Sequence, residues 1–198
     1  MDVLFSRFSN YKDCNFQTDK NLIDDFKSIA KILVVGSGGL GCEILKNLAL
    51  SEVKNIYVID LDTIELSNLN RQFLFRDKDI GKFKCEIAAN YIKDRFNDID
   101  IKYSSKNIQE IKIESIKQFN IIIGGLDNME ARMYINKLVH DLVNFDEEGN
   151  IIEETIIPFI DGGTEGFRGQ SRVIIPFKSS CLNCTKNLDT KRVNILKF

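Results

Sequence analysis

The residues whose types and spacing best fit a chemical role are four glycines near the start of the chain. Gly36, Gly38, Gly39 and Gly41 lie in the segment GSGGLG, which satisfies the pattern G-x-G-x-x-G and follows the apolar run at residues 32–35. Glycines in this pattern permit a tight turn and let backbone N–H groups approach phosphate at the positively polarised start of a helix. The segment therefore predicts a nucleotide phosphate site, with close helix–strand packing alone as the alternative.

Polar residues downstream extend this prediction. Asp60 ends the next apolar run, in the place where a carboxylate can accept a hydrogen bond from a ribose hydroxyl. The polar residues that follow it, and that could face a triphosphate, are Asp62, Asn68, Arg71, Gln72 and Lys84. A nicotinamide dehydrogenase would not need so many polar groups here, and it usually has a substrate domain for which little chain remains. ATP is therefore favoured over NAD.

The apolar pattern predicts the elements that position these residues. Strands are predicted at residues 32–35, 56–59, 99–103, 119–123, 156–160 and 171–175. Helices are predicted at residues 18–29, 38–50, 83–96, 111–117 and 128–143, although 111–117 would also suit a strand. Residues 62–82 are expected to be irregular, residues 146–154 to form an acidic turn, and Gly162, Gly163 and Gly166 to lie in a flexible loop. This alternation predicts an α/β fold with a Rossmann-like, open, mostly parallel sheet and helices on both faces.

Composition excludes several classes of protein. The chain has 198 residues, enough for one generous domain, and a net charge of −2, which gives no electrostatic reason to expect nucleic acid or an anionic membrane as partner. No apolar run is long enough to span a membrane. Five cysteines with irregular spacing favour a reduced, intracellular protein over a secreted one.

One cysteine pair has the spacing of metal ligands. Cys181 and Cys184 form a Cys-x-x-Cys pair, which supplies two of the four ligands of a tetrahedral zinc site. The other cysteines, at 14, 42 and 85, have no matching spacing. Zinc is therefore expected to be absent or only partly ligated in this chain.

Longer motifs resemble the ThiF/MoeB-type adenylation domain of ubiquitin-like-protein activating enzymes across about residues 30–185. These motifs are GSGGLGCE at 36–43, IDLD at 59–62, SNLNRQFLF at 67–75, KDIGKFK at 78–84, GLDN at 125–128, PFIDGGTEGF at 158–167 and CLNC at 181–184. Within the family, the run from Asp161 and the acidic residues 146–154 look most like the branch that activates the neddylation modifier.

The resemblance implies adenylation, in which the C-terminal carboxylate of a ubiquitin-like protein attacks the α-phosphate of ATP and pyrophosphate leaves. It implies that Asp60 binds the ribose, that Asn68, Arg71 and Gln72 surround the phosphates, and that Lys84 neutralises charge at the transferring centre. Asp127 would hold Mg²⁺, which makes Arg71, Lys84 and Asp127 the expected catalytic residues. The residues alone leave open whether Asp127 only caps the following helix, and whether Asp62 contacts nucleotide or orients the loop.

The resemblance also implies partners. A homologous regulatory subunit would form a heterodimer with this chain, and a conjugating enzyme would bind through domains that the chain lacks, in the cytoplasm or the nucleus. Residues 1–30 are expected to form an arm and a helix, and residues 31–180 the adenylation domain. Residues 181–198 would begin a truncated zinc and catalytic-cysteine segment, without the thioester step. The alternative functions are a non-catalytic fragment that binds nucleotide or a partner, and a sulfur-carrier-protein adenylyltransferase. The glycines at 162, 163, 166 and 169 are expected to lie near the extended tail of the ubiquitin-like protein, with simple turn chemistry as the alternative.

Overall fold

The run Lys31–Val35 forms strand β1, which lies inside a six-stranded sheet. A computed structural model describes residues 20–165 and 167–185, so the predicted helix start at Thr18 lies outside the described residues. The remaining strands are β2 (Asn55–Ile59), β3 (Asp100–Ser104), β4 (Ile121–Gly124), β5 (Phe159–Glu165) and β6 (Arg168–Ile174). The helices are α2 (Lys20–Ile29), α3 (Gly39–Leu50), α4 (Lys84–Lys93), α5 (Ile113–Ile116) and α6 (Met129–Asp141). Short 3₁₀ turns are η1 (Leu66–Asn68), η2 (Asp77–Asp79), η3 (Ile108–Glu110) and η4 (Glu153–Thr155).

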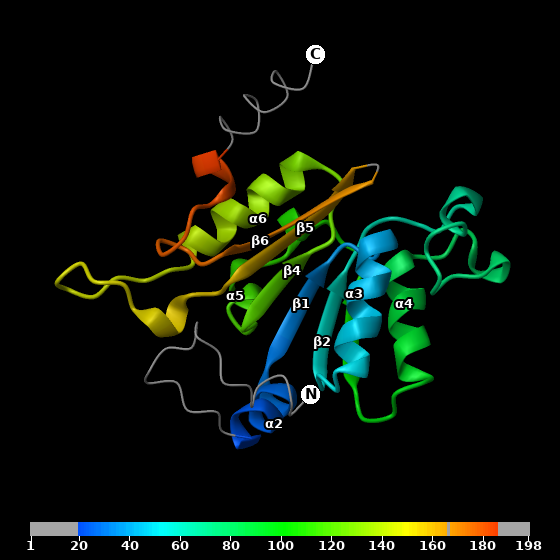
Figure 1. Ribbon diagram of the computed structural model, residues 1–198, viewed down its shortest axis with the longest axis horizontal. Coiled ribbons are helices and arrows are strands. Elements are labelled where there is room, and N and C mark those ends of the chain that lie inside the picture. Colours follow the sequence, from blue (N-terminus) through cyan, green and yellow to red (C-terminus); the bar gives the residue numbers. More distant parts are fainter. Residues whose placement is uncertain (1–19, 166, 186–198) are drawn as a thin grey trace, which may run out of the picture.

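The strand order is β3-β2-β1-β4-β5-β6 (Figure 1). All neighbouring strands are parallel except β5 and β6, which pair antiparallel as a hairpin. The chain moves outward from β1 to β3 and then returns to β4 on the other side of β1. The order therefore reverses between β1 and β4, the point at which open α/β sheets bind ligands beyond the carboxyl ends of their strands. The predicted mostly parallel, open sheet is confirmed.

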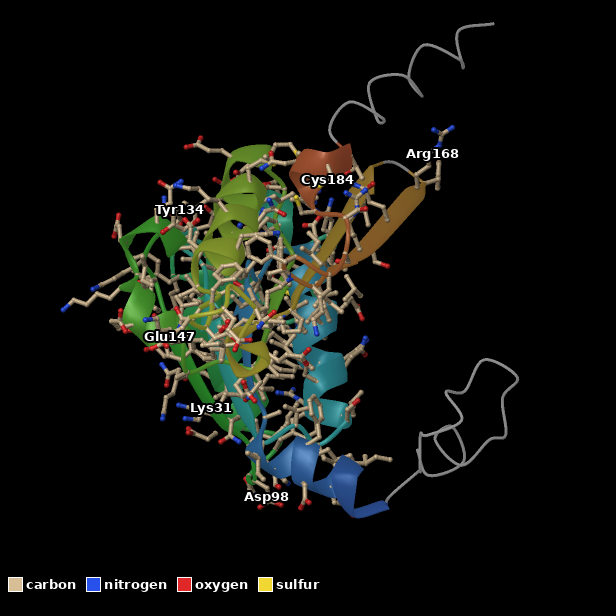
Figure 2. The ribbon with its side chains drawn as sticks, turned by 90° about the vertical axis from the view of Figure 1, so that its left-hand side faces the viewer. Lys31, Asp98, Tyr134, Glu147, Arg168 and Cys184 are labelled. Atoms are coloured by element: carbon tan, nitrogen blue, oxygen red, sulfur yellow. The ribbon has the colours of Figure 1, made fainter. Side chains whose placement is uncertain are left out.

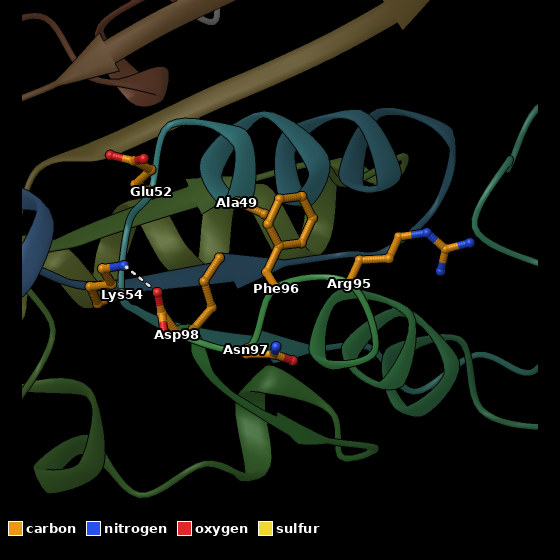
Figure 3. Close-up of a pocket in the computed structure, with 8 residues that line it drawn as sticks. Ala49, Glu52, Lys54, Arg95, Phe96, Asn97 and Asp98 are labelled. Carbon is orange, nitrogen blue, oxygen red and sulfur yellow. Dashed lines mark ion pairs between the residues drawn. The ribbon is translucent and has the colours of Figure 1, made fainter.

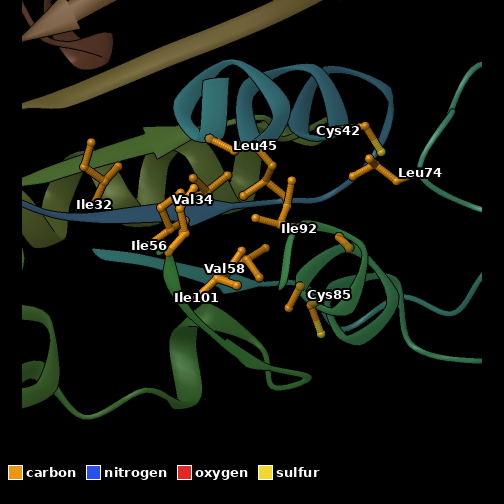
Figure 4. Close-up of a cluster of buried hydrophobic side chains, with 14 of the residues drawn as sticks. Ile32, Val34, Cys42, Leu45, Ile56, Val58, Leu74, Cys85, Ile92 and Ile101 are labelled. Carbon is orange, nitrogen blue, oxygen red and sulfur yellow. The ribbon is translucent and has the colours of Figure 1, made fainter. Parts of the chain in front are cut away.

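Alternate residues of β1 enter two separate hydrophobic cores. Ile32 and Val34 belong to a cluster with side chains of α3 and α4, whose members are shown in Figure 4. Leu33 and Val35 belong to a second cluster with side chains of α5 and α6. Because successive strand residues point to opposite faces, the continuous apolar run requires cover on both sides. The predicted placement of helices on both faces is confirmed.

The irregular stretch after β2 is anchored by its own apolar residues. Leu74 and Phe75 are 1% and 3% exposed and join the core beneath α3 and α4. A backbone hydrogen bond joins the two ends of the stretch, because the N–H of Ile64 donates to the carbonyl of Lys82 at 2.8 Å. The predicted irregular segment is thus a fixed loop, held in place by burial rather than by regular secondary structure.

Two predictions about the last part of the sheet are wrong. Strand β5 begins at Phe159, after the 3₁₀ turn η4, and not at residue 156. Gly162 and Gly163 lie inside β5, paired with Ser171 and Gln170 of β6, and not in a flexible loop. Their missing side chains have a packing role, because a Cβ at Gly162 would lie 2.9 Å from Leu40 of α3. The short segment at 111–117, left open between helix and strand, contains the helix α5.

No helix within residues 20–165 and 167–185 has the length and apolar character required to cross a membrane.

Candidate functional site

Packing requires two glycines where β1 leads into α3, Gly36 in the turn and Gly41 in the first turn of the helix. Gly36 has a φ of +95°, and a Cβ there would lie 2.7 Å from the backbone oxygen of Gly125, which follows β4. A Cβ at Gly41 would lie 2.1 Å from the backbone oxygen of Gly36. These contacts bring the turn after β1 against the turn after β4. For Gly36 and Gly41, the packing explanation that the sequence left open therefore applies.

At the other two glycines, a Cβ would make ordinary van der Waals contacts without a collision. The atom nearest to a Cβ at Gly38 would be Nε2 of Gln72 at 3.9 Å, and at Gly39 it would be Cγ of Arg71 at 3.8 Å. Gly38 is the N-cap of α3 and provides no side-chain hydrogen bond to the first N–H groups of the helix. Uncapped N–H groups at a helix N-terminus attract anions. The structure therefore brings Arg71 and Gln72 beside Gly38 and Gly39 at the N-terminus of α3, where uncapped N–H groups could attract a phosphate.

Asp60 joins the ends of β2 and β1. Its Oδ2 accepts hydrogen bonds from the N–H of Ser37 at 2.6 Å and from the hydroxyl of Ser37 at 2.8 Å. Its Oδ1 accepts from the N–H of Asp62 at 2.9 Å. Each carboxylate oxygen has more than one lone pair, so a ribose hydroxyl could share Asp60 with these backbone contacts.

Asp62 holds Lys84, the first residue of α4. The Nζ of Lys84 lies 2.9 Å from Oδ2 of Asp62, and the backbone N–H of Lys84 donates to the carbonyl of Asp62 at 2.9 Å. Lys84 is 8% exposed, whereas the side chain of Asp62 is 54% exposed. Of the two roles that the sequence left open for Asp62, this geometry supports orientation of the loop and of Lys84.

Three further predicted residues occupy the loop between β2 and α4. Asn68 is buried, and its Oδ1 accepts from the N–H of Glu65 at 2.9 Å, so its amide oxygen stabilises η1. Arg71 is exposed and donates through Nη1 to the carbonyl of Ser67 at 3.1 Å. Gln72 is 3% exposed, and its Oε1 is buried without a hydrogen-bond partner among the described residues. A buried amide oxygen without a partner is costly, so this atom is a candidate acceptor for a hydrogen bond from a bound molecule.

Asp127 lies directly beyond β4 and is exposed. The helix α6 is capped by its neighbour instead, since Oδ1 of Asn128 accepts from the N–H of Ala131 at 2.8 Å. Within the described residues, the carboxylate of Asp127 makes no hydrogen bond or ion pair. The capping alternative is therefore wrong for Asp127, whose carboxylate remains available to a cation.

Sequence reasoning missed Arg132 and Asp161 as individual site residues. Nε of Arg132 in α6 lies 3.5 Å from Oδ1 of Asp161 in β5, and the residues are 8% and 4% exposed. Burial raises the pKa of the Asp161 carboxyl, and the positive charges of Arg132 and Arg172 oppose that rise. The signal was present, because Arg132 has the helical spacing of the buried residues Ile135 and Val139.

The two cysteines of the Cys-x-x-Cys pair lie together after β6. Their sulfur atoms are 3.5 Å apart, and the N–H of Leu182 donates to Oδ1 of Asn136 in α6 at 3.1 Å. Burial would raise the pKa of the Cys181 thiol, but hydrogen bonds from the backbone and thiol of Cys184 outweigh it and lower that pKa. In the described part of the chain, no group of three or more His, Cys, Asp or Glu side chains is arranged to hold a metal ion. The pair alone fits half of a zinc site.

A cavity of about 310 Å³ lies away from all these residues, between the turns that precede β2 and β3 (Figure 3). Its walls carry charges of both signs, including Lys54 and Asp98, whose charged atoms are 3.9 Å apart. Figure 2 shows Asp98 and Cys184 at opposite ends of the molecule. The predicted site residues instead follow the carboxyl ends of β1, β2 and β4, where the sheet order reverses. That edge is the candidate site for an anionic nucleotide and a cation.

Comparisons with known proteins show what this chain is similar to. The NEDD8-activating enzyme E1 catalytic subunit of Dictyostelium discoideum is 48% identical over 189 residues, which cover 93% of this chain and 43% of that protein. The Caenorhabditis elegans protein of the same name is 51% identical over 83% of this chain and 38% of its own length. The crystal structure of E. coli MccB with ATP has a TM-score of 0.68 and 26% identity, and the match covers 90% of this chain and 51% of that one.

The chain thus spans less than half the length of these two NEDD8-activating relatives. The pattern that describes the ThiF family matches residues 17–197, which is nearly the whole sequence. With a Rossmann-like sheet, a glycine turn at its reversal point and this match along its length, the chain belongs to the ThiF family.

Proposed function

We propose that this chain carries out the ATP-dependent adenylation of the C-terminal carboxylate of a ubiquitin-like protein. The observation that carries the proposal is the convergence of three turns at the reversal point of the sheet. The turn after β1 touches the turn after β4 through Gly36 and Gly125, and it touches the end of β2 through Ser37 and Asp60. This arrangement brings the uncapped N-terminus of α3, the buried Lys84 and the exposed Asp127 to one edge of the sheet, which supports the proposal.

The residues present fit ATP. Gly38 provides no side-chain cap at the N-terminus of α3, the aliphatic part of the Arg71 side chain lies beside Gly39, and Nε2 of Gln72 lies near Gly38. A water molecule bound with the nucleotide could donate to the buried Oε1 of Gln72, and Nε2 of Gln72, which lies near Gly38, could donate to a phosphate oxygen. The solved relative E. coli MccB was crystallised with ATP, which supports the same ligand here.

Adenylation requires positioning and charge neutralisation, not a protein nucleophile, because the substrate carboxylate itself attacks the α-phosphate. Lys84 is held by Asp62 with its ammonium fixed in place before any substrate arrives. Arg71 uses Nη1 for Ser67 and Asn70, and its remaining N–H groups are available to phosphate oxygens. Both cations would stabilise charge as it shifts from the α-phosphate to the leaving pyrophosphate.

Mg²⁺ fits the carboxylate of Asp127, since hard divalent cations prefer oxygen ligands and this side chain is exposed and unpaired among the described residues. When bound, the ion would neutralise phosphate charge. Asp127 would hold it, and Asp60 would bind the ribose hydroxyl. No other residue of the described chain is assigned to the cation.

The substrate that we propose is a ubiquitin-like protein of the NEDD8 type, because relatives at 48% and 51% identity carry the name NEDD8-activating enzyme E1 catalytic subunit. We propose a homologous regulatory subunit as partner, and a conjugating enzyme that binds through segments other than these residues. The extended tail of the substrate would run along the glycines of the β5–β6 hairpin. Free thiols at Cys42, Cys85, Cys181 and Cys184 support a reducing cytoplasmic or nuclear location.

We propose that Cys181 and Cys184 are two of the four ligands of a zinc ion, and that the other two ligands do not come from these 198 residues. X-ray fluorescence on the purified chain should then give less than one equivalent of zinc. A full equivalent with four protein ligands in this chain would contradict the proposal.

Pyrophosphate exchange tests the main proposal. The chain is incubated with ATP, Mg²⁺, radioactive pyrophosphate, a NEDD8-type protein and the regulatory subunit, and incorporation of label into ATP is measured. Exchange that depends on the ubiquitin-like protein and is lost in Asp127→Ala supports adenylation. No exchange even with the regulatory subunit present supports the non-catalytic alternative, and exchange only with a sulfur-carrier protein supports the sulfur-carrier alternative.

A further inference from the structure

Arg132 is a buried cation whose side chain reaches back to the segment that carries Asp127. It lies one turn into α6 and is 8% exposed. Its Nη2 donates to the carbonyl of Leu126 at 2.6 Å, and its Nε donates to the same carbonyl at 3.2 Å. Two donors on one carbonyl hold the residue immediately before Asp127.

The same guanidinium is fixed on its other side by β5. Nη2 also donates to the carbonyl of Gly162 at 3.0 Å, and Nε lies 3.5 Å from Oδ1 of Asp161. A Cβ at Gly163 would lie 2.4 Å from Nη2, so β5 has room for the guanidinium only because position 163 has no side chain. Figure 1 shows α6 lying over this part of the sheet. Arg132 therefore ties α6, β5 and the turn after β4 to one another.

Asp127 lies between two fixed points. Before it, the N–H of Gly125 donates to the carbonyl of Val35 at 2.9 Å, and Arg132 holds Leu126. After it, Asn128 caps α6. Between these points the carboxylate of Asp127 has no partner of its own within the described residues. The position of Asp127 is therefore set by its two chain neighbours, Leu126 and Asn128. Arg132 is the side chain that holds Leu126.

We propose that Arg132 is a positioning residue, which places the carboxylate of Asp127 for Mg²⁺ through the carbonyl of Leu126. This inference rests on the proposed function, because it assigns to Asp127 the cation of the adenylation centre. Partners that orient a metal ligand commonly change metal affinity by about 10- to 100-fold when they are lost.

A role limited to neutralising Asp161 makes a different prediction. Lysine could supply the positive charge beside Asp161, but its ammonium cannot reproduce the planar fork that bonds Leu126 and Gly162 together. Arg132→Lys therefore separates the two roles. It preserves a cation in the buried pair and removes the geometry that holds Leu126.

The test measures ATP binding to the purified chain by calorimetry over a range of Mg²⁺ concentrations, with no turnover required. The variants are Arg132→Lys, Arg132→Gln, Asp127→Asn and the double variant Asp127→Asn with Arg132→Lys. Lys137→Ala is the matched control, because Lys137 lies on the same helix with a side chain that is 76% exposed. Thermal unfolding, monitored by circular dichroism, identifies the variants that fold. Two different substitutions at Arg132 are made so that the test remains possible if one variant does not fold.

We expect folded Arg132 variants to need about tenfold more Mg²⁺ for half-maximal ATP binding, with ATP affinity in the absence of Mg²⁺ preserved. In the Asp127→Asn chain, the added Arg132→Lys change should have little further effect, because both act through one carboxylate. An Mg²⁺ requirement that Asp127→Asn raises but Arg132→Lys and Arg132→Gln leave unchanged would overturn this inference alone. No Mg²⁺-dependent ATP binding by the unchanged chain, or none altered by Asp127→Asn, would overturn the proposed function together with it.

Discussion

At the scale of single residues, the candidate site depends on side chains held in place before a ligand arrives. Lys84 is nearly buried, and Asp62 fixes its ammonium at 2.9 Å. A preorganised cation stabilises developing charge without a further cost of reorganisation. Asp62 is half exposed, so the pair is not expected to contribute much to folding stability. The pair is therefore better explained by a role in the chemistry than by a role in stability.

Replacing Lys84 or Arg71 by alanine should lower the rate of pyrophosphate exchange by about two to three orders of magnitude, as expected for loss of one preorganised charge donor. The control is Lys82→Ala, because Lys82 lies two residues from Lys84 and pairs with Asp79 at 3.2 Å. Exchange in the control should remain close to that of the unchanged chain. Equal loss in Lys82→Ala and Lys84→Ala would show that general surface charge, not placement, is responsible.

Two buried cysteines should make the fold sensitive to alkaline pH. Burial raises the pKa of the Cys42 thiol from 9.0 to about 12 and that of the Cys85 thiol from 9.0 to about 11. Above pH 9 the unfolded chain loses these protons and the folded chain keeps them, so the free energy of unfolding falls as the pH rises. Urea unfolding between pH 8 and 11 should show this decline at up to about 1.4 kcal/mol per pH unit for each thiol.

Cys42→Ala should flatten this decline, even though the cavity it leaves lowers stability at every pH. The exposed Lys137 gives the control, and Lys137→Ala should keep the full slope. Identical slopes in the Cys42→Ala and unchanged chains would show that Cys42 does not cause the pH dependence.

At the scale of elements, two glycines at the start of α3, three residues apart, have different roles. Packing requires Gly41, whereas we propose that Gly38 lies against phosphate. A Cβ at Gly41 would collide with the backbone oxygen of Gly36 at 2.1 Å, whereas a Cβ at Gly38 would meet nothing closer than 3.9 Å. Backbone cannot move aside as the end of a side chain can, because the turn is held against β4 through Gly125. The two positions should therefore respond differently to the same substitution.

Gly41→Ala should destabilise the fold by about 3 kcal/mol or more, as a backbone collision in a packed turn does. Gly38→Ala should change the free energy of unfolding by less than about 1 kcal/mol and weaken ATP binding at least about tenfold, because its methyl group enters the phosphate space. Urea unfolding and calorimetry measure both quantities. Normal ATP binding by Gly38→Ala would show that the phosphates of ATP do not bind at this turn.

At the scale of the whole molecule, α6 links the candidate site to the cysteine pair. Its first turn holds the segment of Asp127 through Arg132, and about one turn further on, Oδ1 of Asn136 accepts from the N–H of Leu182, between the two cysteines. Asn136 is 1% exposed, so its amide can bond only to protein neighbours. The Cys-x-x-Cys segment is thus docked on the same helix that borders the nucleotide edge.

Asn136→Ala should release the cysteine segment, because it leaves the N–H of Leu182 without an acceptor, at a cost of about 1–3 kcal/mol. Alkylation of Cys181, which is 8% exposed in the folded chain, should become faster, and the midpoint of thermal unfolding should fall. Lys137→Ala, on the exposed side of the same helix, should change neither. Unchanged alkylation of Cys181 in Asn136→Ala would show that other contacts hold the segment.

Local pattern made most of the architecture predictable. Apolar runs marked the buried strands, helical spacing marked α3, α4 and α6, and the GSGGLG turn fell between a strand and a helix as expected. The bounds of β5 were not predictable in this way. The sequence predicted a loop at Gly162 and Gly163, because the residues packed against them, Leu40 and Arg132, lie far away in the sequence.

The sequence by itself determined the α/β alternation, the glycine turn and the polar residues that follow β1, β2 and β4, since these depend on neighbours within a few residues. Only the tertiary structure decided that Gly36 and Gly41 serve packing while Gly38 and Gly39 stay open, that Asn128 rather than Asp127 caps α6, and that Arg132 is buried. Each of these outcomes depends on atoms brought together from separate strands and helices. The physical reason is that a side chain's role follows from the space and the partners around it, and the fold alone supplies both.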